Sequence, residues 1–170
     1  RFMSRTTPLP DELRARAFTV AEAHQLGLGE GRLRNLDLSR PAYGVRRLGP
    51  TEGLAKLAEA TRLVLPGGSA FSHLTAARVL GLPVPRRWDP TEALAVMSVT
   101  SASLVRRAGC DGHHGLESRR VVARNGLRVV SPEDTWCDLA AGGTMGLDDL
   151  IVLGDEVVHF RRGVPTAQLT

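Results

Sequence analysis

Residues 30–48 read EGRLRNLDLSRPAYGVRRL, and this stretch decides the fold that we predict for the N-terminal part of the chain. Its first half predicts a helix from about Glu30 to Asp37. Pro41 ends that helix, because proline cannot continue the helical hydrogen bonds. The residues from Ala42 to Leu48 then alternate in polarity like a short strand.

Two shorter helices are predicted upstream of this stretch. Asp11 caps the first, over residues 11–17, and Thr19 caps the second, over about residues 20–26. A glycine turn at residues 27–29 separates the second helix from the third. Helix, helix, glycine turn, helix and short strand is the order of a winged helix-turn-helix, the DNA-binding module that places one helix in the major groove.

The third helix has two distinct faces at 3.6 residues per turn. Leu33 and Leu36 fall together and are expected to face a core, whereas Arg34 and Asn35 fall opposite, with Arg32 on the flank. Arginine can donate two hydrogen bonds to guanine, and asparagine can form two with adenine. Residues of these types on one face predict a base-reading surface.

The strand and its approach carry the groups expected to contact phosphates, because phosphate contacts position a recognition helix. The predicted double-stranded DNA site therefore comprises Arg32, Arg34, Asn35, Arg40, Tyr43, Arg46 and Arg47. The alternative that the pattern leaves open is that the arginines are the solvated face of an amphipathic helix.

The remainder of the chain predicts a small domain that mixes helices and strands. The whole is therefore expected to be α+β, with a winged helix-turn-helix over residues 1–50 and a small mixed α/β domain over residues 51–170. Helices are predicted at 51–63 (capped by Thr51), 70–80 (starting at Ser69 or Ser72), 131–141 (capped by Ser131) and 147–158, with Thr166 capping a further one; strands are predicted at 93–100, within 104–124 and at 126–130.

Composition and charge narrow the class of protein. Of 170 residues, 42% are hydrophobic and only 4% aromatic, and Lys56 is the only lysine beside 21 arginines. The net charge is +4 over residues 1–50, +1 over 51–100, +4 over 101–130 and −5 over 131–170. Segregated positive charge is typical of a polyanion partner. Arg119, Arg120, Arg124 and Arg128 are expected to extend the basic surface. With no long apolar run and no signal-peptide pattern, we expect a cytoplasmic protein with no membrane segment.

Familiar catalytic motifs are absent from the sequence. Restriction-type nucleases use a carboxylate, one spacer residue and a lysine, but Leu54 stands two positions before Lys56. The sequence also lacks a phosphate-binding glycine loop, a His-Glu-x-x-His motif and a Gly-x-Ser-x-Gly elbow. We therefore expect no catalytic residue and no cofactor.

A histidine- and cysteine-containing segment raises the question of a metal site. Cys110, His113 and His114 lie within five residues, with His73 and Cys137 as distant candidates for further ligands. A structural zinc site normally takes four ligands from two separated pairs. We expect an ordinary loop and no metal, and His73 is expected to serve in capping or packing.

Four stretches together resemble a known family. They are RLRNLDLSRPAYGVR (32–46), FSHLTAARVLGLP (71–83), GLRVVSPEDTWCDLA (126–140) and DDLIVLGDEVV (148–158). In this order they are similar to the AbiEi-like type IV antitoxins, the transcriptional regulators of abortive-infection systems, as found in actinobacteria. The resemblance spans about residues 18–170.

The resemblance implies a non-enzymatic regulator that binds promoter DNA through its N-terminal winged helix. It also implies a nucleotidyltransferase-type toxin as partner of the second domain. Many relatives carry a C-terminal domain similar to very-short-patch-repair endonucleases, so this sequence is expected to stop before such a domain. Two alternatives stay open: the non-catalytic front part of an endonuclease, and a protein-interaction module whose acidic end, residues 133–156, docks a basic toxin.

Overall fold

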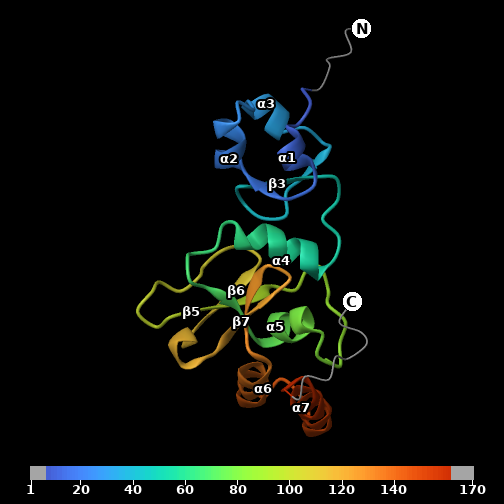
Figure 1. Cartoon of the computed structure of the whole chain (residues 1–170), viewed down its shortest axis with the longest axis vertical. Coiled ribbons are helices and arrows are strands. Elements are labelled where there is room, and N and C mark those ends of the chain that lie inside the picture. Colours follow the sequence, from blue (N-terminus) through green and yellow to red (C-terminus); the bar gives the residue numbers. More distant parts are fainter. Residues whose placement is uncertain (1–6, 162–170) are drawn as a thin grey trace. The chain divides into compact units, whose positions relative to one another are not determined.

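The chain forms a mixed α+β structure, as the sequence predicts. A computed structural model describes residues 7–161, and within that range it has seven α-helices and two sheets. The chain divides into two compact units, Arg1–Leu65 and Pro66–Thr170, and each is described by itself (Figure 1). The predicted cap at Thr166 lies outside the described residues.

The first unit alternates short helices with short strands. Its sheet has the order β1-β3-β2, and both pairings are antiparallel, with Phe18 opposite Arg46 and Leu38 opposite Leu48. The elements are α1 (Asp11–Arg14), β1 (Phe18–Thr19), α2 (Val20–Gln25), α3 (Glu30–Leu33), β2 (Leu38–Ser39), β3 (Val45–Leu48) and α4 (Leu54–Arg62).

A small apolar core holds these short elements together. Leu13 of α1, Phe18 of β1 and Leu33 of α3 are fully buried in it, together with Ala23 of α2. Thr19 caps α2 as predicted, because its side-chain oxygen accepts a hydrogen bond from the backbone N–H of Glu22 at 3.1 Å. Helices of four to six residues are not stable alone, so this burial holds them.

The helix predicted over residues 30–37 is wrong in length, because α3 is a single turn that ends at Leu33. The Asn35 side chain accepts a hydrogen bond from the N–H of Leu36, and its carbonyl accepts one from Leu38. Short polar side chains that bond the local backbone in this way compete with helix formation. As a result Leu36 is 100% exposed instead of facing the core.

The helix predicted from Thr51 begins later, at Leu54, after Gly53 with a φ of 82°. Thr51 does not cap it; its Oγ1 lies 2.9 Å from Ser39 Oγ instead. This helix, α4, packs on β3, where Ala60 is buried with Val45. The boundary between the compact units therefore follows α4, at Leu65, and not residue 50 as predicted.

The second unit contains a five-stranded mixed sheet with the order β6-β5-β4-β8-β7. The β4–β8 and β5–β6 pairs are parallel, and the β4–β5 and β7–β8 pairs are antiparallel. The elements are β4 (Ala70–Phe71), α5 (His73–Leu80), β5 (Leu94–Ser98), β6 (Cys110–His114), a 3-10 turn (Leu116–Ser118), β7 (Val121–Arg124), β8 (Leu127–Val130), α6 (Pro132–Ala141) and α7 (Leu147–Arg161).

Local sequence signals predict several of these elements well. Every residue of β5 is buried, in agreement with the apolar run over 93–100. Ser131 caps α6 by accepting a hydrogen bond from the N–H of Asp134, and Pro132 occupies its first turn. Ser72 immediately precedes α5, although its side chain makes no capping hydrogen bond. The two-residue strand β4 in front of it was not predicted.

The last two helices lie side by side (Figure 1). The indole N–H of Trp136 on α6 donates to the carbonyl of Leu150 on α7 at 2.8 Å. Leu153 and Val157 of α7 are buried, and Gly154 leaves room for the Trp136 ring. Over residues 7–161, no helix is both long and apolar enough to cross a membrane.

One glycine of the sheet gives a direct test of this packing. A Cβ on Gly112 of β6 would clash with the backbone oxygen of Val105, whereas a Cβ on Gly67 would meet nothing within 4 Å. Gly112→Ala is expected to destabilise the protein by about 1–3 kcal/mol. Gly67→Ala, as the matched control, is expected to stay within about 0.5 kcal/mol of the original. Urea unfolding of both variants measures this, and equal midpoints would contradict the packing of β6.

Candidate functional site

Three of the predicted DNA-binding side chains of the first unit lie at its surface. The Arg34 side chain is 74% exposed, just after α3, and its guanidinium lies 3.7 Å from the carboxylate of Glu30. Arg40 is exposed, and Tyr43 is 87% exposed. Both lie on the loop between β2 and β3, so residues 34–43 present two cations and a phenol to solvent.

Arg32, which was predicted to contact DNA, is instead a structural residue. Its side chain is only 6% exposed, and both guanidinium NH groups donate to the two carboxylate oxygens of Asp37 at 2.8 Å. Its Nε donates to the carbonyl of Thr7 at 2.6 Å. A bidentate arginine–carboxylate pair of this kind leaves no guanidinium edge for a phosphate.

Arg46 and Arg47 also turn part of their side chains inward. Arg46 donates through Nε to the carbonyl of Leu33 and through NH1 to that of Val45. The Arg47 side chain is 15% exposed and lies 3.5 Å from the carboxylate of Glu59 on α4. Arg47 therefore links β3 to α4, and its predicted role in holding phosphate is not supported by this geometry.

The charge of Arg46 is only partly compensated. Burial lowers the pKa of the Arg46 guanidinium from its ordinary value, and the positive charge of Arg40 lowers it further, against a smaller opposing effect of Glu30. Two like charges that disfavour each other are relieved when an anion binds near both. Arg40, on the loop between β2 and β3, and Arg46 of β3 therefore reinforce each other's positive potential.

Asn35 was predicted to read adenine from a helix face. It lies after the end of α3, is half-buried, and its side-chain oxygen accepts from the N–H of Leu36 at 3.2 Å. The side chain thus shapes the turn from α3 to β2. Its position next to Arg34 still keeps it at the edge of the exposed segment.

Two arginines of the second basic zone pair with acidic residues of α6. Arg119 donates to the carboxylate of Asp138, and this hydrogen bond raises the pKa of the guanidinium. Arg120 pairs with Glu133 at 2.9 Å, and its side chain is 70% exposed. Arg128 donates to the backbone carbonyls of Ser69 and Gly68. The expected extension of the basic surface stays a prediction for Arg120, whereas Arg119 is compensated by a buried carboxylate.

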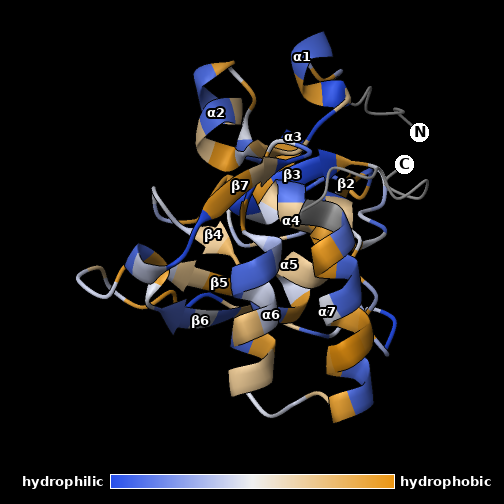
Figure 2. Cartoon of the chain, turned by 60° about the horizontal axis from the view of Figure 1, so that its bottom comes forward, coloured by the Kyte–Doolittle hydropathy of each residue, from blue (hydrophilic) through white to orange (hydrophobic). Residues whose placement is uncertain are grey.

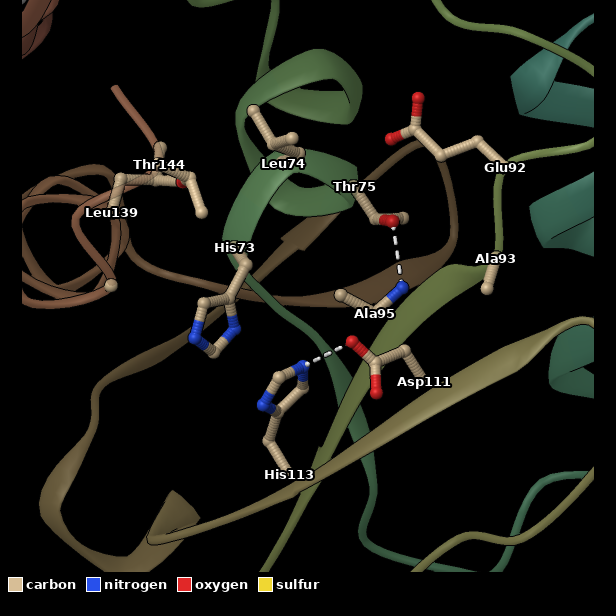
Figure 3. Close-up of a pocket in the computed structure, with 11 residues that line it drawn as sticks. His73, Leu74, Thr75, Glu92, Ala93, Ala95, Asp111, His113, Leu139 and Thr144 are labelled. Atoms are coloured by element: carbon tan, nitrogen blue, oxygen red, sulfur yellow. Dashed lines mark hydrogen bonds and ion pairs between the residues drawn. The ribbon is translucent and has the colours of Figure 1, made fainter. Parts of the chain in front are cut away.

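Two histidines of the second unit, His73 and His113, lie in contact (Figure 3). The His73 ring at the start of α5 stacks on the His113 ring of β6, with 4.0 Å between ring centroids and 26° between the planes. His113 Nε2 lies 3.2 Å from a carboxylate oxygen of Asp111, and His73 Nδ1 lies 3.0 Å from Ser72 Oγ. The His73 side chain therefore packs on His113 and lies next to the Ser72 hydroxyl, and it does not cap α5.

The backbone at His73 is unusual. Its φ is 48°, in the left-handed region that residues other than glycine adopt at a cost of about 1–2 kcal/mol. Burial lowers the pKa of the His73 imidazole, and the neighbouring His113 lowers it further. Strained backbone and a perturbed titratable group occur together at functional sites more often than elsewhere.

The histidine and cysteine segment does not assemble a cluster of metal ligands. In the part of the chain that the structure describes, no group of three or more histidine, cysteine, aspartate or glutamate side chains is placed to hold a metal ion. Cys110 and Cys137 are both free thiols, and burial raises the pKa of Cys110.

Sequence reasoning missed the meeting of His73 with His113. Asp111 and His113 are two residues apart, and side chains at this spacing in a strand lie on the same face. This part of the site could have been predicted from the sequence. The approach of His73 depends on the order β6-β5-β4, which brings residues 40 positions apart together and has no local sequence signal.

The chain matches no protein-family model, and it has no significant match among curated proteins.

Replacement of Arg32 tests the inward assignment of its side chain. Arg32→Ala leaves Asp37 and the Thr7 carbonyl without their donor, and we expect a loss of about 1–2 kcal/mol in unfolding free energy, reduced by the partial exposure of Asp37. Arg34→Ala, which removes the same charge two residues away, is expected to change it by less than about 0.5 kcal/mol. Unfolding in guanidinium chloride measures the free energy of unfolding of both variants. A destabilised Arg34→Ala together with an unchanged Arg32→Ala would contradict the inward placement of the Arg32 side chain.

Proposed function

We propose that the chain is a non-enzymatic, antitoxin-like transcriptional regulator whose first unit binds double-stranded DNA as a winged helix. The observation that carries this proposal is the order α1-β1-α2-α3-β2-β3 together with the antiparallel sheet order β1-β3-β2. A winged helix uses this connectivity, with two helices after the first strand and a loop between the last two strands.

The surface chemistry of the first unit supports the same proposal. Arg34, Arg40 and Tyr43 are exposed along a segment that joins the end of α3 to the loop before β3. The mutual repulsion of Arg40 and Arg46 favours an anion there. Phosphate oxygens of a DNA backbone are the anions that such loops contact.

The short α3 changes the roles that the sequence suggests. In the proposed complex Arg34 reads base edges, Arg40 and the Tyr43 hydroxyl contact phosphates, and Arg46 adds charge behind them. Arg32 and Arg47 hold the unit in shape. With one helical turn and the following turn reaching the major groove, few bases are contacted directly, so the sequence preference is expected to be modest.

The proposed partner of the second unit is a nucleotidyltransferase-type toxin with a basic surface. On α7, Leu147, Ile151 and Val158 are exposed at spacings of four and seven residues, which places them on one face. The exposed Asp148 and Asp155 lie on the same helix, and Figure 2 shows hydrophobic and hydrophilic segments along it. An apolar stripe beside carboxylates supports docking of a basic protein.

Two variants separate base reading from phosphate contact. Arg34→Ala is expected to reduce the preference for a selected duplex over a scrambled one by about 1–3 kcal/mol. Arg40→Ala is expected to weaken both duplexes equally and to reduce the slope of log affinity against log salt by about one. Fluorescence anisotropy with labelled duplexes over a range of salt concentrations measures both effects.

Arg87→Ala is the matched control, because it removes one exposed arginine from a loop of the second unit. Its DNA affinity is expected to equal that of the unaltered chain apart from a small effect of net charge. Failure of the unaltered chain to bind any duplex at low salt would end the proposal. Co-purification with the product of a neighbouring gene in that case would favour the interaction-module alternative.

A further inference from the structure

The stacked histidines line a cavity in the second unit that the proposed function does not use. Its volume is about 520 Å³, within the range of small-molecule sites. The start of α5, the residues that lead into β5, strand β6 and the end of α6 enclose it. Leu74, Ala93, Ala95 and Leu139 provide an apolar lining, and His73 and His113 provide two aromatic rings (Figure 3).

Two carboxylates, those of Asp111 and Glu92, are among the polar groups that line this cavity. Glu92 pairs with Arg78 through one carboxylate oxygen, and the other is buried. The oxygen of Thr75 is already used, since it accepts from the N–H of Ala95 at 2.9 Å. The side chain of Asp111 is 66% exposed, so its carboxylate is the acceptor that a ligand with N–H groups can reach.

The charges around the cavity disfavour an anion. No lysine or arginine is among its lining residues in the described chain. Arg78 is held by Glu92, and Arg119 is held by Asp138. Asp111 lies 3.2 Å from His113 Nε2 and is 66% exposed, so its carboxylate faces a ligand beside an aromatic and apolar wall. Phosphate-bearing ligands are therefore expected to be excluded, and organic cations to be attracted.

We propose that this cavity binds a small organic cation, an amine, amidine or guanidine on an apolar or planar body. The nitrogen donates to Asp111, and the body packs against Leu74, Leu139 and the exposed part of the histidine pair. The inference concerns the second unit alone and does not depend on DNA binding by the first. The same chemistry is found in free metabolites and in an arginine side chain of a partner protein.

Benzamidine is a direct probe, because it combines a planar ring with an amidinium group. Isothermal titration of the full chain with benzamidine is expected to show saturable binding. Benzamide, which is neutral, and benzoate, which is anionic, have nearly the same shape and are expected to bind at least about tenfold more weakly. Benzamide or benzoate binding as tightly as benzamidine would overturn the proposal. Absence of binding by both benzamidine and the arginine peptide described next would also overturn it.

An acetylated and amidated Ala-Arg-Ala tripeptide is the second cationic probe. Tighter binding of benzamidine points to a free small molecule, and tighter binding of the tripeptide points to a side chain of a partner. Both results support the shared cation chemistry of the site.

Asp111→Asn removes the exposed carboxylate of the cavity while keeping its size. It is expected to weaken benzamidine binding by about tenfold, the loss that corresponds to one charge-assisted hydrogen bond. Asp148→Asn, an exposed aspartate on α7, is the matched control and is expected to leave the affinity unchanged. Equal affinities of the two variants would contradict the assigned site.

The pH dependence of benzamidine affinity distinguishes a role of His73 in ligand binding from a purely structural role of its side chain. His73 faces His113 and Asp111 of β6, Asp138 of α6 and Arg119, and its pKa lies below the ordinary value because of burial and of His113. As the pH falls through this lowered pKa, His73 takes up a proton and repels the bound cation. Benzamidine affinity is therefore expected to fall with falling pH.

His73→Asn removes the titrating group, and asparagine tolerates the left-handed backbone at this position better than most residues. The variant is expected to bind benzamidine with an affinity that falls less steeply with falling pH than that of the unaltered chain. A pH dependence as steep as that of the unaltered chain would contradict the role given to His73.

Discussion

The ion pair between Arg32 and Asp37 is the interaction on which the arrangement of the first unit depends. It joins α3 to the turn before β2, and through the Thr7 carbonyl it holds the segment in front of α1. The pair fixes the turn that follows α3, where Asn35 bonds the local backbone and the chain turns toward β2. The pair thus determines which side chains face solvent: Arg34 remains outside, and Arg32 does not.

The charged residues are arranged differently in the two units. In the second unit, basic and acidic zones that are separate in the sequence pair across the fold, as Arg119 does with Asp138. In the first unit, Arg40 lies near Arg46, and the repulsion between them lowers the pKa of the Arg46 guanidinium. Like-charged arginines therefore face each other in the first unit, whereas Arg119 of the second unit is paired with a carboxylate.

Local signals in the sequence predict much of the fold. The cap at Thr19, the cap at Ser131 and the buried strand over 94–98 follow from short patterns whose physics is complete within a few residues. The two-residue strands β1, β2 and β4 exist only because of their partners, so no local pattern predicts them. The inward turn of Arg32 and the stacking of His73 on His113 likewise depend on tertiary contacts. Of the side chains predicted to contact DNA, Arg34, Arg40 and Tyr43 are therefore exposed, whereas Arg32 and Arg47 turn inward to carboxylates of the first unit.

We propose that the exposed segment after α3 and the loop before β3 bind DNA. A titration of the ¹⁵N-labelled full chain with double-stranded DNA at low ionic strength, followed by amide chemical shifts, tests this directly. The largest shifts are expected within residues 34–47, and the shifts of amides around the histidine-lined cavity are expected to stay unchanged. Shifts confined to residues 66–161, or no shifts at all, would contradict this proposal.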